Sequence, residues 1–192
     1  LQHQLTSTLA TVAQDVKIQV EFNPATVKEY RLVGYTNRTL RNEDFNNDKV
    51  DAGDIGSGHS VTAIYEIIPQ GKQGWLNESR YQKAPAASGG KNEYAFVKVR
   101  YKLPGQSTSK LIEQAVPAVS IPLAQADEDT RLALAAASYA QALRGGEYNG
   151  KLDWDVIEQM AKQAKGKDPF GLQEEFVELV KIAKSLSSKQ AQ

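Results

Sequence analysis

The sequence contains no cysteine and only two histidines, His3 and His59. The absence of cysteine excludes disulfide bonds, thiolate nucleophiles and cysteine-based zinc sites. With two imidazoles, a Ser-His-Asp triad would have to be built around one of these residues. No apolar stretch reaches the roughly 18 residues that mark a candidate membrane helix, so no membrane span is predicted for this chain.

Net charge is absent as well. Lysine and arginine total 23, and aspartate and glutamate also total 23. A chain without net charge has no long-range field that draws it onto nucleic acid or an anionic membrane, and we expect neither as a partner. Its 192 residues are enough for one domain or two small ones. Because the first residue is leucine and no signal peptide is visible, we expect any targeting signal to lie upstream.

The first part of the chain alternates apolar and polar residues with the period of two that is typical of β-strands. The pattern predicts strands over residues 16–22, 27–36, 60–68 and 93–102, and one or two short strands within 110–121, broken near Pro117. Residues 69–92 are rich in small and polar residues, which predicts a long mobile loop. Several such strands joined by polar turns predict a small antiparallel β-sandwich over residues 15–122.

After Pro122 the apolar period changes to about 3.6, as in amphipathic helices. The pattern predicts three helices, over residues 128–144, over residues 154–165, and from Asp168-Pro169 to about residue 187. Aspartate is available as the capping residue at each start: Asp127 or Asp129, then Asp153, then Asp168. Strands followed by helices predict an α+β fold, a β-sandwich with a three-helix C-terminal region over residues 123–192.

The segment of residues 44–54, DFNNDKVDAGD, is the sharpest candidate for a binding site. Its oxygen-bearing side chains are Asp44, Asn46, Asp48, Asp51 and Asp54. Calcium takes six to eight oxygen ligands, and short polar side chains at alternate positions supply them. However, an EF-hand loop would need glycine and glutamate where this chain has Lys49 and Ile55. We therefore favour a polar turn in which these side chains bond to their own backbone, with a metal site as the alternative.

Two further patterns imitate sites for nucleotides or nucleic acids. Residues 53–60, GDIGSGHS, have the spacing of a P-loop, but His59 replaces the phosphate-binding lysine and a strand-like run follows, which favours a turn. Aromatic and basic side chains interleave on a predicted strand, at Tyr94, Phe96, Lys98, Arg100 and Tyr101. Such a surface suits single-stranded nucleic acid or a protein contact. The zero net charge favours a protein contact, or packing against the helices.

Four phrases carry a resemblance to a known family: VKIQVEFNP, YRLVGYTNR, EDFNNDKVDAGDIG and GHSVTAIYEI. They resemble the region that follows the von Willebrand factor type A domain in bacterial proteins of the YfbK type. The resemblance implies that residues 1–14, whose apolar side chains have helical spacing, are the remnant of the last helix of an upstream type A domain. It also implies a location in the bacterial cell envelope, periplasmic or lipid-anchored. The DxSxS metal motif of similar adhesion domains does not occur in this chain.

These observations lead to two hypotheses for function. The first is a non-enzymatic protein-interaction or scaffold module, with no catalytic residues and no cofactor. Its expected partners are the upstream type A domain of the same polypeptide and another protein. The alternative is a metal-dependent hydrolase or calcium-binding module that uses the segment from Asp44 to Asp54. A third possibility, carbohydrate binding, depends on analogy with other sandwich folds alone.

Overall fold

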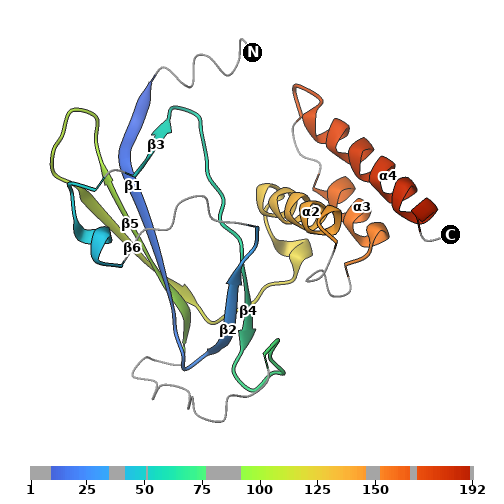
Figure 1. Ribbon diagram of the computed structural model, residues 1–192, viewed down its shortest axis with the longest axis horizontal. Coiled ribbons are helices and arrows are strands. Elements are labelled where there is room, and N and C mark those ends of the chain that lie inside the picture. Colours follow the sequence, from blue (N-terminus) through green and yellow to red (C-terminus); the bar gives the residue numbers. More distant parts are fainter. Residues whose placement is uncertain are drawn as a thin grey trace. The chain divides into compact units, whose positions relative to one another are not determined.

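The computed structural model describes residues 10–34, 42–50, 52–76, 92–145, 152–164 and 168–190. Within these ranges the strands come first and the α-helices last, which confirms the predicted α+β fold (Figure 1). The chain divides into two compact units. The first comprises residues 1–31 and 36–119, and the second comprises residues 32–35 and 120–192.

The first unit is built from antiparallel strands. These are β1 (Thr11–Phe22), β2 (Val27–Leu32), β3 (Gly53–Gly56), β4 (Tyr65–Pro69), β5 (Glu93–Lys102) and β6 (Lys110–Pro117), with a short 3-10 helix, η1 (Asn42–Asn46), between β2 and β3. Four of them form a sheet in the order β3-β1-β5-β6, while β2 and β4 form a second sheet. Figure 1 shows β1, β5 and β6 as long neighbouring strands.

Aromatic rings join the two sheets. The ring of Phe22, at the end of β1, stacks on Tyr30 of β2 with 4.1 Å between centroids. The same ring meets Tyr65 of β4 edge-on, with 5.3 Å between centroids. Such ring pairs stabilise a contact beyond the area that they bury. The strand pattern of the sequence therefore leads to a small sandwich of unequal sheets.

The start of β1 corrects the helix that the sequence predicted for residues 1–14. β1 begins at Thr11, and Thr11 and Ala13 pair with Gly56 and Ile55 of β3. A short amphipathic helix is marginal in water, so backbone pairing with another strand outweighs its weak pattern. The rest of the predicted helix, residues 1–9, lies outside the described part of the chain.

Other strand boundaries also differ from the predictions. β2 ends at Leu32, and the chain then bends at Gly34, whose φ of +102° suits glycine and interrupts extended pairing. β4 begins at Tyr65 instead of residue 60. β6 is one strand that ends at Pro117, because proline has no N–H to continue a ladder. The sequence predicts a turn over residues 53–60, whereas residues Gly53–Gly56 form strand β3.

The predicted mobile loop after β4 is only partly described. Residues 70–76 are tied to β2, because the carboxylate of Glu29 accepts the N–H groups of Trp75 and Leu76 at 2.7 and 3.3 Å. The guanidinium of Arg31 lies 5.5 Å from the centre of the Trp75 ring. Residues 77–91, the longer part of the predicted loop, lie outside the described residues.

Among its described residues, the second unit contains a short 3-10 helix and three α-helices: η2 (Leu123–Gln125), α2 (Glu128–Leu143), α3 (Trp154–Gln163) and α4 (Leu172–Gln190). Asp127 and Asp153 cap α2 and α3 by accepting the N–H groups of Thr130 and Val156, at 2.8 and 2.9 Å. Asp168 caps α4 from further away, because Gly171 turns the chain with a φ of +70° first. No helix in the described ranges is long and apolar enough to cross a membrane.

The core of the helical unit is formed by small and aliphatic side chains surrounded by aromatic rings. Its buried members are Ala135, Ile157, Ala161, Val177 and Val180. The ring of Tyr139 on α2 meets Trp154 of α3 and Phe176 of α4 edge-on, at 6.0 and 5.5 Å between centroids. One aromatic residue thus links all three helices.

An ion-pair group on α3 and α4 should make the helical unit sensitive to acid. Hydrogen bonds from Lys162, at 2.5 Å, and from Lys184, at 2.8 Å, lower the pKa of Glu158 to about 2. A carboxylate whose pKa is lowered by folding stabilises the fold fully above its unfolded pKa of about 4.3 and loses that contribution as the pH falls toward 2. The urea concentration at the midpoint of unfolding should fall between pH 5 and pH 2, and we expect it to fall less in Glu158→Gln than in the wild type.

The matched control is Glu175→Gln, which removes a carboxylate from the exposed surface of α4. Its effect on the pH dependence of the urea midpoint should be smaller than that of Glu158→Gln, because it leaves the contacts of Glu158 with Lys162 and Lys184 intact. The same slope in wild type and Glu158→Gln would contradict the role of this ion-pair group.

Candidate functional site

The two faces of the four-stranded sheet differ in what covers them. Residues directly opposite each other in an antiparallel ladder point to the same face. Lys17, Arg100 and Leu111 are opposite one another across β1, β5 and β6, and this face is called the loop face. Ile18, Val99 and Ile112 form the neighbouring row on the other face, which is called the open face.

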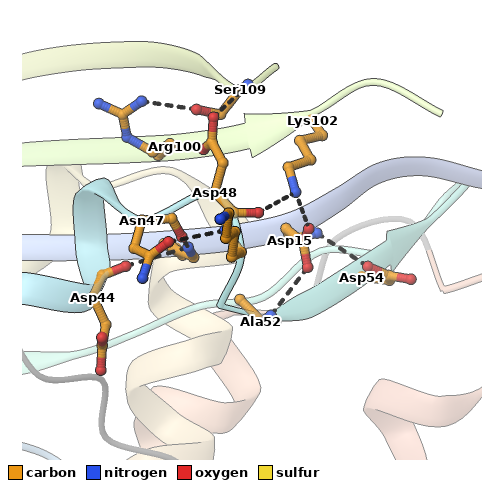
Figure 2. A network of polar contacts seen from close by, with 11 residues as sticks. Asp15, Asp44, Asn47, Asp48, Ala52, Asp54, Arg100, Lys102 and Ser109 are labelled. Carbon is orange, nitrogen blue, oxygen red and sulfur yellow. Dashed lines mark hydrogen bonds and ion pairs between the residues drawn. The ribbon is translucent and has the colours of Figure 1, made fainter. Parts of the chain in front are cut away.

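The acidic segment lies on the loop face, where η1 and the turn after it cover the sheet. The Phe45 side chain is 6% exposed, and the guanidinium carbon of Arg100 lies 5.7 Å from the centre of its ring. This aromatic anchor places the oxygen atoms of residues 44–48 beside the basic side chains of β1 and β5. The residues involved are called the polar cluster: Asp15, Lys17, Asp44, Asn46, Asn47, Asp48, Asp54, Arg100, Lys102 and Ser109 (Figure 2).

Lys17 is the most buried charged residue of the cluster, at 2% exposed. Its ammonium donates to the backbone carbonyls of Asp44, at 3.2 Å, and Asn47. Asp44 lies in η1 and Asn47 directly follows it, and their carbonyls also accept the N–H groups of Asn47 and Val50, both at 3.2 Å. The C-terminal end of a helix carries partial negative charge, which favours a cation there. Lys17 therefore supplies from within the chain the positive charge that a bound cation would bring to these oxygens.

Lys102 and Asp15 form the second contact of the cluster. The Lys102 ammonium lies 2.6 Å from Asp15 Oδ2 and 2.7 Å from the backbone carbonyl of Asp48. Asp15 Oδ1 accepts the N–H of Ala52 at 3.1 Å. The hydrogen bonds from Lys102 and Ala52 hold the pKa of Asp15 below its usual value. One carboxylate thus ties β1 to β5 and to the chain that leads into β3.

Arg100 and Ser109 form the third contact. The guanidinium donates to Ser109 Oγ at 2.7 Å and to Asn46 Oδ1 at 3.1 Å. The Ser109 N–H donates to Asp48 Oδ2 at 3.4 Å. Hydrogen bonds from Ser109 lower the pKa of Asp48. This contact holds the acidic segment against the turn that leads from β5 to β6.

The predicted metal ligands do not converge in the part of the chain that the structure describes. Asp44 contributes its backbone carbonyl, and Figure 2 shows its carboxylate pointing away from the cluster. Asp48 is directed to Ser109, while Asp54 Oδ1 accepts the N–H of Asp15 at 3.1 Å. Among the described residues, no group of three His, Cys, Asp or Glu side chains is arranged to hold a metal ion. Asp51 lies outside the described residues.

The sequence did not predict five members of the cluster: Asp15, Lys17, Asn47, Lys102 and Ser109. Asp15 has the most unusual backbone of these. Its φ of +51° is unusual for a residue other than glycine, and it occupies the irregularity in the β1–β5 register between Gln14 and Lys17. Aspartate is among the few side chains that tolerate this conformation. The one signal in the sequence is its position immediately before the alternating run that begins at Val16.

The other predicted patterns do not form sites in the described structure. Residues 53–56 of the P-loop-like segment form β3, and His59 is an exposed residue whose N–H closes a turn on the Gly56 carbonyl at 3.1 Å. On β5, the Lys98 ammonium lies 5.6 Å from the centre of the Phe96 ring. Arg100, on the same strand, is a member of the polar cluster.

The open face carries aliphatic side chains that remain in contact with solvent. Ile18 is 52% exposed, Ile112 is 53% exposed and Val116 is 37% exposed. Ile18 and Ile112 belong to one cross-strand row through Val99, and Val116 belongs to a second row through Ala95 to Phe22. In the second row Ala95 is 5% exposed and the Phe22 ring contacts Tyr30 and Tyr65 of the second sheet, so the exposed part of the open face is formed by Ile18, Ile112 and Val116. Exposed apolar surface of this kind is typical of interaction sites.

The chain is therefore an α+β polypeptide whose four-stranded sheet carries the polar cluster on one face and exposed aliphatic side chains on the other. It belongs to the family described as "Uncharacterized protein YfbK, C-terminal", whose model matches residues 7–186. It is 44% identical over 188 residues to the uncharacterized protein YfbK of Escherichia coli strain K12, a match that covers 95% of this chain and 32% of that protein. The chain thus spans about a third of that relative's length. No solved structure matched the chain.

Proposed function

We propose that this chain is a non-catalytic module that binds another polypeptide through the open face of its four-stranded sheet. The observation that supports the proposal is the contrast between the two faces. On the loop face the acidic segment covers Lys17, and Leu111 at the sheet edge is 44% exposed, whereas Ile18 and Ile112 on the open face are each more than half exposed. Water at these aliphatic side chains is unfavourable, so covering them with apolar side chains of a partner would stabilise a complex.

The partner that we propose is the remainder of a longer natural polypeptide, in which the module acts as a scaffold. The share of 32% of the relative's length supports a domain within a larger protein. The resemblance of residues 15–68 to the region after a von Willebrand type A domain supports such a domain as the preceding part. In this proposal the whole protein works in the bacterial cell envelope, where a second protein is a further partner.

The test is a calorimetric titration of this chain with the separately produced remainder of the full-length polypeptide. We expect saturable binding that Ile18→Asp weakens by about tenfold or more, because a charge would be buried at the centre of the contact. The matched control is Val61→Asp, at a residue that is 74% exposed and lies outside the strands. Equal affinities of the two variants, each shown to be folded by circular dichroism, would contradict the proposed surface.

The acidic segment has a structural role in this proposal, because the chain's own cations already contact its oxygens. Oxygen atoms of residues 44–48 accept four hydrogen bonds from three cationic side chains, those of Lys17, Arg100 and Lys102. A calcium, magnesium or zinc ion would have to displace these groups before it could bind. We therefore expect no saturable heat when the chain is titrated with each ion in turn. Binding that is abolished by Asp48→Asn would instead support the metal-dependent alternative.

A further inference from the structure

β6 is an edge strand of the four-stranded sheet, and its charged residues and proline, the usual protection of an edge, are limited to Lys110, Glu113 and Pro117. It is the last strand in the order β3-β1-β5-β6, and among the described residues it pairs with β5 alone. Seven of its eight residues are exposed. Its ladder with β5 is regular from Lys110 to Val116, and proline occurs only at its end, at Pro117. The outer N–H and C=O groups of such a strand are a template for another strand.

We propose that β6 pairs with β6 of a second copy of this chain, in antiparallel orientation, to make one continuous eight-stranded sheet. The inference rests on the proposed function, in which the four-stranded sheet binds another polypeptide. The second copy would be one such polypeptide. Two copies that share an edge are related by a two-fold axis perpendicular to the sheet. This axis places the open faces of both copies on one side of the combined sheet. A β6 residue on the open face is therefore opposite a residue on the open face of the other copy.

The side chains of β6 select one register among those that the two-fold axis allows. A register centred on Glu113 places two carboxylates directly opposite each other, which is destabilising. A register centred on Ile112 leaves only residues 110–114 paired and sets Leu111 against Glu113. A register centred on Gln114 pairs residues 111–117 and sets Ile112 against Val116 of the copy. This last register places no like charges opposite each other.

The Gln114-centred register also joins the apolar rows of the two copies. Within one copy, Ile112 continues through Val99 to Ile18, and Val116 continues through Ala95 to Phe22. Setting Ile112 against Val116 of the copy connects these two rows across the boundary. The apolar side chains of β6, which are exposed in one copy, would then contact partners of the same kind. The edge is thus complementary to itself, and this favours a second copy as its occupant.

The absence of cysteine permits a direct test of the register. Gln114→Cys places one thiol at the proposed axis, and residues directly opposite in an antiparallel pair have Cα atoms about 4.5–5.5 Å apart, within reach of a disulfide. We expect mild oxidation to convert most of this variant to a covalent dimer. The matched control is Glu113→Cys, whose thiols would be diagonal to each other and too far apart to bond. Equal crosslinking of both variants, or crosslinking of Glu113→Cys alone, would overturn the register.

A charge exchange tests the pairing without a covalent bond. Sedimentation equilibrium of the unmodified chain should show a concentration-dependent dimer, which Ile112→Glu or Val116→Lys weakens. The double variant should recover about tenfold in affinity over either single variant, because each new carboxylate would face the new ammonium of the other copy. A monomer at all concentrations, or a double variant weaker than both single variants, would overturn the proposal. The titration with the remainder of the polypeptide is a separate experiment, so either proposal can fail alone.

Discussion

Lys17→Met is expected to lower the free energy of unfolding by about 1–3 kcal/mol, because two backbone carbonyls lose their charged donor. Methionine is similar in length and keeps the apolar contacts of the lysine stem. The carbonyls of Asp44 and Asn47 would remain on the loop face without the ammonium that now binds them. Urea denaturation measures the change in stability, and hydrogen exchange should show faster exchange in residues 44–50.

The control for Lys17→Met is Lys98→Met, a change of the same kind on the same face of the sheet. Lys98 lies on β5, and its ammonium is 5.6 Å from the Phe96 ring. We expect this variant to change stability by less than about 1 kcal/mol, the range of an exposed cation–ring contact. If the two variants were equally stable, Lys17 would not hold the acidic segment in the way that its contacts indicate.

Ile157→Ala is expected to destabilise the helical unit by about 3–4 kcal/mol. Ile157 has no exposed surface and lies in the core with Val180 and Ala135. Truncating a buried isoleucine removes apolar contacts and leaves a cavity, which together cost about 2–5 kcal/mol. Denaturation followed by circular dichroism at 222 nm reports on the helices. In a chain with two compact units, the transition of the helical unit should move to lower urea.

The control for Ile157→Ala is Leu186→Ala on α4, where the side chain is 55% exposed. A similarly large apolar side chain is removed, but much of its surface is already in contact with water. We expect less than about half the effect of Ile157→Ala. An equal loss from both substitutions would show that the assigned core does not dominate the stability of this unit.

The helical unit could be predicted from the sequence because its signals are local. The apolar period of 3.6 and the aspartates at 127, 153 and 168 lie within or next to the helices that they define. The largest difference occurs at Gly171, whose positive φ delays the start of α4 to Leu172. A glycine that turns the chain before a helix has no distinct pattern in a single sequence.

The strand unit could be predicted only where alternation marks a half-buried strand, as in residues 16–22 and 93–102. β3 has glycine at both ends and no alternating apolar pattern, and it becomes a strand because β1 pairs with it. Lys17 occupies a polar position in its alternating run, yet it is buried because a segment about 30 residues later in the sequence covers that face. Such long-range contacts leave no signal in local periodicity.

The central claim is that the loop face is a closed framework and the open face is the binding surface. Hydrogen exchange of this chain, measured alone and then within the full-length natural polypeptide, tests the claim most directly. The account predicts slower exchange in β1 and β6 around Ile18 and Ile112 in the longer polypeptide, with residues 44–50 unchanged. Slower exchange confined to residues 44–50, with β1 and β6 unchanged, would contradict it and place the binding surface on the acidic segment.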